Sequence, residues 1–172
     1  MEPKRGNSTT TGRLLVVADW ATDAAAVVAA CSWRQEEDGA TLGLVVPARL
    51  HGLDWAGDPT ASIPCAQRQV TTIGWLAAAS GLHFDAAAVG DPDPLAAIWD
   101  ALADWPAVEL LLCPRPRRVA LPHPFDLEHR ARRLTGLAVS RLALPASRAP
   151  RSAPGLLGVG RGHCVLDQPQ AA

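Results

Sequence analysis

The stretch V-G-D-P-D-P-L-A-A-I at residues 89–98 decides the fold of this chain. It is typical of a short strand that ends in a tight turn and leads into an amphipathic helix. Gly90 allows a backbone conformation that other residues avoid, Asp91 can cap the helix, and Pro92 suits its first position. Such a turn directs free N–H groups to the carboxyl edge of a parallel sheet, where small anions bind. We therefore predict Gly90 and Asp91 to be ligand-binding residues.

Strands and helices alternate along the rest of the chain. Apolar runs predict strands at residues 13–18, 40–46, 83–89, 108–113 and 137–144, and helical spacing of apolar residues predicts helices near 24–35, 65–80, 95–102 and 125–134. This alternation implies right-handed crossovers and a parallel sheet that is covered on both faces. We predict a Rossmann-like, three-layer α/β/α sandwich with a five-stranded parallel sheet in the order 3-2-1-4-5 and two helices on each face.

The composition fits one domain with tails. The chain has 172 residues, of which 48% are hydrophobic, which is enough to bury a sizeable core. Its net charge is −1, so no overall field attracts it to nucleic acid or to a membrane. We expect a flexible arm at residues 1–12, the folded domain at residues 13–145 and a mostly disordered tail at residues 146–172, which is rich in Ser, Ala, Pro, Gly and Arg.

The sequence shows no targeting segment. Residues 1–12 lack the apolar core of a secretory signal, and no apolar run approaches the roughly 18 residues of a membrane span. Lys4 is the only lysine, and alanine and arginine are abundant, which is typical of a GC-rich bacterial genome. We therefore expect a cytoplasmic bacterial protein.

The four cysteines are scattered at positions 31, 65, 113 and 164, without the C-x-x-C spacing of a metal site or a redox pair. Cys31 and Cys113 fall on apolar stretches, so we expect buried thiols and no metal site. A catalytic pair of Cys113 and His123 near the carboxyl edge is the alternative. The pattern contains neither an orienting acid nor an oxyanion hole for such a pair, so we predict no catalytic residues.

Four short motifs stand in a recognisable order: L-L-V-V-A-D at residues 14–19, G-D-P at residues 90–92, the leucine-rich strand at residues 108–113, and G-L-A-V at residues 136–139. Together with the alternating elements, they resemble the universal stress protein family over residues 13–144. The resemblance implies an adenine nucleotide alpha hydrolase-like fold in which Asp19 lies at the ligand edge. The chain looks most like a degenerate branch of small bacterial domains of this type.

The loop after the fourth strand departs from the family. ATP-binding members carry the glycine-rich pattern G-x-x-G-x9-G-[ST] there, whereas residues 113–124 of this chain contain no glycine. Glycine lets backbone amides wrap a triphosphate closely, while proline cannot donate an amide hydrogen bond. We therefore expect no cofactor, and no binding of ATP in the manner of the family.

The same loop carries Arg115, Arg117 and Arg118, which can bind a phosphate or a carboxylate through bidentate hydrogen bonds. We include them with Asp19 among the ligand-binding residues, although a solvated loop is the simpler alternative. Three further arginines are expected on the outer face of the following helix, at positions 130, 132 and 133. No aromatic residues are interleaved with these arginines, which argues against a nucleic-acid partner.

The sequence thus predicts a non-enzymatic, universal-stress-protein-like domain with a binding or regulatory role in the stress response. A nucleotide- or anion-binding protein, or an enzyme that uses the carboxyl edge, is the first alternative. An interaction protein that docks an acidic partner through its arginine-rich face is the second. The apolar strand predicted at residues 137–144 would be an edge strand, so we also expect a homodimer that pairs through it.

Overall fold

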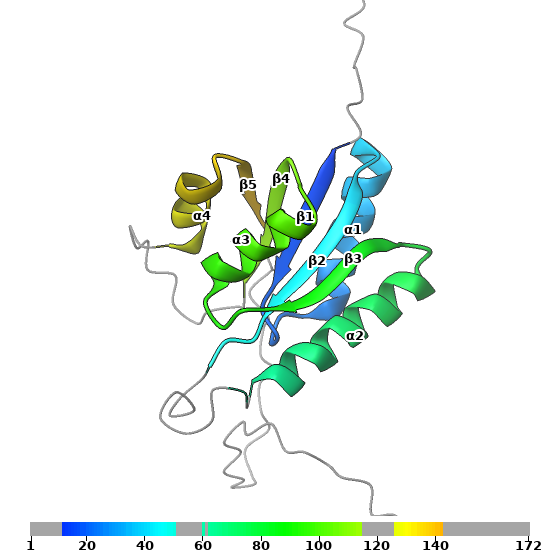
Figure 1. Cartoon of the computed structure of the whole chain (residues 1–172). Helices are drawn as coiled ribbons and strands as arrows, with labels where there is room; N and C mark the ends of the chain where they lie inside the picture. Colours follow the sequence, from blue (N-terminus) through cyan, green and yellow to red (C-terminus); the bar gives the residue numbers. More distant parts are fainter. Residues whose placement is uncertain (1–11, 51–59, 61, 115–125, 143–172) are drawn as a thin grey trace, which may run out of the picture.

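The computed structural model describes residues 12–50, 60, 62–114 and 126–142 (Figure 1). The elements in chain order are β1 (Arg13–Ala18), α1 (Ala24–Asp38), β2 (Thr41–Pro47), α2 (Ile63–Ala79), β3 (Phe84–Gly90), α3 (Pro94–Asp104), β4 (Glu109–Cys113), α4 (Leu127–Thr135) and β5 (Ala138–Arg141). The predicted tail lies outside the described residues, as does the predicted arm except for Gly12.

The five strands form one parallel sheet in the order β3-β2-β1-β4-β5, which confirms the predicted topology. Strand β1 lies in the middle, where Leu15 is aligned with Gly43 of β2 and with Leu110 of β4. Five of its six residues are buried. A continuous apolar run is what a strand covered on both faces requires, because neither face meets water.

Two helices cover each face of the sheet. Leu14 and Val16 of β1 pack in one apolar cluster with residues of α1 and α2. Leu15 and Val17 point to the opposite face and pack with residues of α3 and α4. Successive side chains of a strand point to opposite faces, so β1 contributes to both cores.

The helix after β3 begins two residues later than the sequence predicted. Asp93 is the N-cap residue, its Oδ1 accepts from the N–H of Leu95 at 3.2 Å, and Pro94 is the first helical residue. Asp91 does not cap the helix, because its Oδ1 accepts from the N–H of Asp93 at 2.8 Å in the turn. A residue that precedes a proline avoids the helical region, which places Asp93 outside the helix.

Gly90 is needed for space and not for an unusual backbone angle. The glycines with positive φ among the described residues are Gly39, Gly81 and Gly136. A Cβ atom at Gly90 would lie 2.6 Å from the Cβ of Ala97 and 2.9 Å from Cγ2 of Val45. The turn lies where the sequence predicts it, but the predicted reason for Gly90 was wrong. The lack of a side chain at Gly90 allows α3 to pack closely on the sheet.

Candidate functional site

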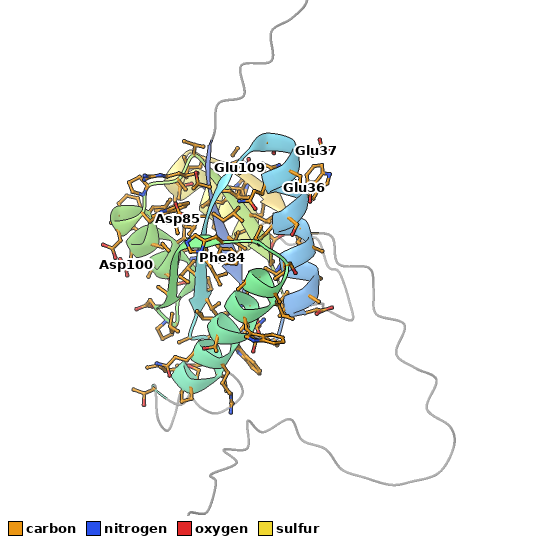
Figure 2. All side chains as sticks on the ribbon, turned by 90° about the vertical axis from the view of Figure 1, so that its right-hand side faces the viewer. Glu36, Glu37, Phe84, Asp85, Asp100 and Glu109 are labelled. Atoms are coloured by element: carbon orange, nitrogen blue, oxygen red, sulfur yellow. The ribbon has the colours of Figure 1, made fainter. Side chains whose placement is uncertain are left out.

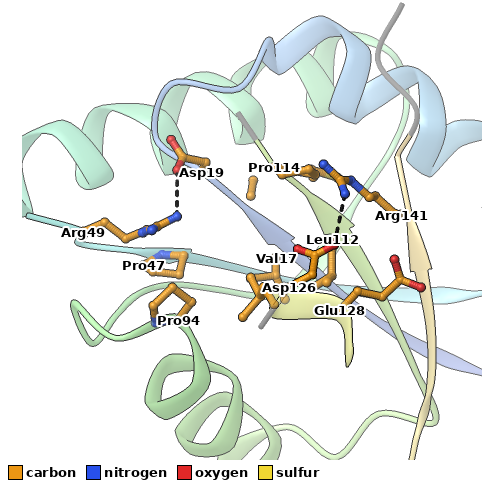
Figure 3. Close-up of a pocket in the computed structure, with 13 residues that line it drawn as sticks. Val17, Asp19, Pro47, Arg49, Pro94, Leu112, Pro114, Asp126, Glu128 and Arg141 are labelled. Atoms are coloured by element: carbon orange, nitrogen blue, oxygen red, sulfur yellow. Dashed lines mark hydrogen bonds and ion pairs between the residues drawn. The ribbon is translucent and has the colours of Figure 1, made fainter. Parts of the chain in front are cut away.

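A pocket opens at the carboxyl edge of the sheet, between the ends of β1 and β4 (Figure 3). The chain leaves β1 toward β2 on one side and leaves β4 toward β5 on the other, so this is the point where the strand order reverses. Ligands of open α/β sheets bind at such points. The cavity has a volume of about 50 Å³, and the wider hollow, which is open to solvent, encloses about 450 Å³ of empty space. Its lining includes the apolar residues Val17, Ala18, Pro47, Pro94, Leu112 and Leu127, and the charged residues Asp19, Arg49, Asp126, Glu128 and Arg141.

Asp19, which the resemblance to the family places at the ligand edge, lines this pocket and is 8% exposed. Its role in ligand binding stays a prediction. Its Oδ1 accepts from the N–H of Ala21 at 2.9 Å, and its Oδ2 lies 3.6 Å from Nη1 of Arg49. Its own N–H donates to the carbonyl of Cys113 at 3.1 Å. The carboxylate is thus held by the turn after β1, and the backbone bond ties the end of β1 to the end of β4.

A second set of buried hydrogen bonds fixes the same corner. The hydroxyl of Thr22 donates to the carbonyl of Cys113 at 2.7 Å, and the side-chain amide of Gln69 donates to the carbonyl of Thr22 at 2.7 Å. Buried polar groups are stable only when they are paired, so α2 and the turn before α1 are joined to the floor of the pocket. Neither Thr22 nor Gln69 was predicted to take part in the site, because isolated Thr and Gln residues form no motif.

Helix α4 and strand β5 supply the opposite wall. Asp126 is the N-cap residue of α4, and its Oδ2 lies 3.3 Å from Nη1 of Arg141 on β5 (Figure 3). Glu128, in the first turn of α4, accepts from Arg132 at 3.1 Å. Carboxylates are favoured at the positive end of a helix. Two carboxylates of the chain itself therefore stand where an external anion would be attracted.

The other predicted ligand residues are distributed differently. Gly90 and Asp91 are not among the residues that line the pocket. The N–H groups of Asp93 and Leu95 beyond them already donate to aspartate side chains, so these two are not open donors for an anion. Arg115, Arg117 and Arg118 lie outside the described residues.

The thiols are buried, as predicted. Burial raises the pKa of Cys31 to about 12, and it raises the pKa of Cys113 still further, with the neighbouring Cys31 as a smaller cause. Both thiols are therefore protonated at neutral pH, and a protonated thiol is a poor nucleophile. His123, the partner in the alternative catalytic pair, lies outside the described residues.

Among the described residues, no group of three or more His, Cys, Asp or Glu side chains could hold a metal ion. None of the helices described is long and apolar enough to cross a membrane.

No protein-family model matches this chain, and no curated protein matches it. Among solved structures, it is similar to a universal stress protein from Archaeoglobus fulgidus, with a TM-score of 0.52 and 14% sequence identity. The match covers 76% of this chain and 93% of the other. At this identity the likeness shows the fold alone, and it confirms that the chain has the fold of a universal stress protein.

Proposed function

We propose that this chain is a non-enzymatic, cytoplasmic domain of the universal stress protein type, which has a regulatory role. It binds a small ligand in the pocket between β1 and β4 and does not bind ATP in the manner of the family. The observation that carries this proposal is the placement of Asp126 and Glu128 at the N-terminus of α4, beside the pocket. A pocket is present at the carboxyl edge of the sheet, while the N-terminus of α4, which would favour a phosphate, already carries two carboxylates.

The charges around the pocket oppose a triphosphate. Three carboxylates line it, and the two lining arginines are each within 4 Å of one of them, Arg49 of Asp19 and Arg141 of Asp126. A phosphate would have to displace these pairs and would lie beside the carboxylates that remain. Charge-assisted hydrogen bonds contribute roughly 1.5–3 kcal/mol each, so the loss of several leaves little affinity. We expect ATP to bind more weakly than about 1 mM.

A small anionic ligand is the second candidate. The guanidinium groups of Arg49 and Arg141 stand on opposite walls of the pocket, at the ends of β2 and β5. A planar carboxylate could accept bidentate hydrogen bonds from one of them if its present partner moved away. In the sequence, Pro114, which lines the pocket, is followed within four residues by Arg115, Arg117 and Arg118. Their positive charges would add to the attraction of an anionic ligand.

Calorimetry with ATP, ADP, AMP and inorganic phosphate tests the proposal. Thermal unfolding supports it, because a ligand that binds only the native state raises the stability of that state. We expect no heat of ATP binding at 0.1 mM protein, which is about a tenth of the dissociation constant expected. A micromolar dissociation constant for ATP would overturn the proposal. If phosphate or a simple carboxylate binds and Arg141→Ala abolishes that binding, the second candidate replaces the first.

The existence of a ligand pocket is tested separately by screening small apolar fragments against the ¹⁵N-labelled protein. We expect binders to shift the amide signals of Asp19 and Leu127, which both line the pocket. If every binder shifts signals elsewhere, the pocket is not the binding site.

A further inference from the structure

The outer side of β3 is an unpaired sheet edge. Strand β3 is seven residues long and lies at the end of the strand order, and no described strand pairs with its outer side. The N–H of Ala48 donates to the carbonyl of Gly90 at 3.1 Å, so Gly90 directs its backbone groups toward β2. Backbone groups of successive residues point to alternate sides of a strand. Ala87 and Val89 therefore direct their N–H and C=O groups away from the sheet.

The opposite edge of the sheet is blocked, whereas no described residue hydrogen-bonds to the outward backbone groups of Ala87 and Val89. Strand β5 has only four residues, and Nη2 of Arg132 donates to the carbonyl of Val139 at 3.1 Å. Exposed edges are usually blocked by short strands, by lysine or proline, or by a covering group. The register of β3 shifts once, between Phe84 and Ala86, where the charged residue Asp85 lies, and it is regular from Ala86 to Gly90. The strand contains neither lysine nor proline.

The side chains leave the edge of β3 easy to approach. Ala87 and Ala88 are exposed, and a methyl group does not hinder another backbone from coming within hydrogen-bonding distance. Figure 2 looks onto this side of the molecule, with β3 in front and α3 beside it. A strand added here would extend the sheet from five strands to six.

The side of this edge that is formed by β3 and α3 is negative. Asp85 is exposed on β3 and Asp100 is exposed on α3, which packs against β3 (Figure 2). The segment from β3 through α3 holds five acidic residues and no basic one: Asp85, Asp91, Asp93, Asp100 and Asp104. A second copy of the chain would bring two such segments together, whereas a basic segment would neutralise them.

We propose that the outer edge of β3 is a docking site for an extended, basic segment of a partner protein. The segment adds a strand through the backbone groups of Ala87 and Val89, and its lysine or arginine side chains lie beside Asp85 and Asp100. Main-chain hydrogen bonds give the affinity in this mode of recognition, and the flanking charges select the partner. This proposal does not depend on the ligand pocket, which lies between β1 and β4.

The probe is the peptide acetyl-Val-Lys-Val-Arg-Val-Lys-amide, titrated to 1 mM into the ¹⁵N-labelled protein. We expect the amide signals of Ala87 and Val89 to shift, while those of β5 stay in place. The acidic counterpart acetyl-Val-Glu-Val-Asp-Val-Glu-amide should bind at least tenfold more weakly. Equal binding of the two peptides, or shifts confined to other elements, would overturn the proposal, as would the absence of any shift.

Variants separate the contribution of charge from that of the backbone. The double variant Asp85→Asn with Asp100→Asn should bind the basic peptide about three- to tenfold more weakly, whereas Glu36→Gln, an exposed charge on α1, should not change binding. Ala87→Pro removes one outward N–H and should abolish binding of the basic peptide. The amide signals of β1 in this variant show whether its fold is intact.

If Ala87→Pro does not fold, the double variant Asp85→Asn with Asp100→Asn still tests the proposal. Protein that dimerises without peptide and broadens the β3 signals would identify a second copy as the occupant and contradict the proposal.

Discussion

Asp126 and Arg141 form an ion pair at 3.3 Å that joins the N-terminus of α4 to the end of β5 at the wall of the pocket. Both side chains are nearly half exposed, so the pair contributes only about 0–1 kcal/mol to stability. We propose that its effect is on binding, because it places an internal carboxylate at the positive end of the helix and keeps Arg141 beside that carboxylate.

Replacing this carboxylate should create an anion site. In Asp126→Asn one negative charge is lost, which frees Arg141 and leaves Glu128, already paired with Arg132, as the carboxylate in the first turn of α4. We expect phosphate at 10 mM to raise the melting temperature of the variant but not of the parent at the same ionic strength. Asp100→Asn, on the exposed side of α3, is the matched control and should behave as the parent. If the Asp126 variant shows no phosphate effect, this carboxylate does not control the site.

Two glycine substitutions should change stability in opposite directions. Gly90→Ala should destabilise the protein by about 1–3 kcal/mol, because its Cβ would lie 2.6 Å from that of Ala97. At Gly74, inside α2, an added Cβ meets nothing within 4 Å, so Gly74→Ala should stabilise by roughly 0.5–1 kcal/mol. Urea unfolding measures both. An unchanged unfolding free energy for Gly90→Ala would mean that α3 can move away from the sheet at little cost.

The topology of the sheet was predictable because each central strand is a continuous apolar run. The run at residues 13–18 could only belong to a strand covered on both faces, and the spacing of the runs left room for one helix between each pair. The ends of the elements were less predictable. The sequence predicted the first helix over residues 24–35 and Gly39 as its stop; α1 continues to Asp38, and Gly39 takes the left-handed conformation that ends it.

The candidate site was predictable only in part. Asp19 was proposed because the resemblance to the universal stress protein family places an acidic residue at the end of the first strand, and it does line the pocket. Arg49, Asp126 and Arg141 were missed, because they lie far apart in the sequence and meet only when the ends of β2, α4 and β5 converge.

Alkaline pH should destabilise the protein through its buried thiols. The pKa of Cys31 is raised to about 12 in the native state and that of Cys113 is raised as well, so both keep their protons there above pH 9, while the unfolded chain loses them. Stability is therefore complete below about pH 9 and falls between pH 9 and 12, by about 1.4 kcal/mol per pH unit for each thiol that ionises only on unfolding. The chain has no tyrosine and Lys4 as its only lysine, so few other groups titrate in this range.

Urea unfolding at pH 8 and pH 10.5 measures this effect, with Cys31→Ala as the comparison. The variant should be less stable at pH 8, because it leaves a cavity, but its stability should fall less steeply with pH. Equal slopes for the two proteins would show that Cys31 does not keep its proton in the folded state.

The homodimer expected through β5 stays a proposal, and the structure shows which residue of this edge can be substituted to test it. Val139 is 8% exposed and packs in the core, so a lysine there would disturb the fold as well as the edge. Arg132 is the better position, because its guanidinium donates to the carbonyl of Val139 at 3.1 Å and covers the edge of β5. Arg132→Ala should expose this edge and increase pairing between copies.

Light scattering at about 100 μM protein measures the mass of the parent and the variants. We expect Arg132→Ala to shift the population toward the dimer, while Arg130→Ala, an exposed arginine on the same helix, leaves it unchanged. Arg132 also pairs with Glu128, so Glu128→Gln is needed to show that the loss of this ion pair alone has no effect. If all three variants and the parent remain monomers, the edge of β5 does not pair. If the parent is already a dimer and Arg132→Ala does not strengthen it, the two copies associate through another surface.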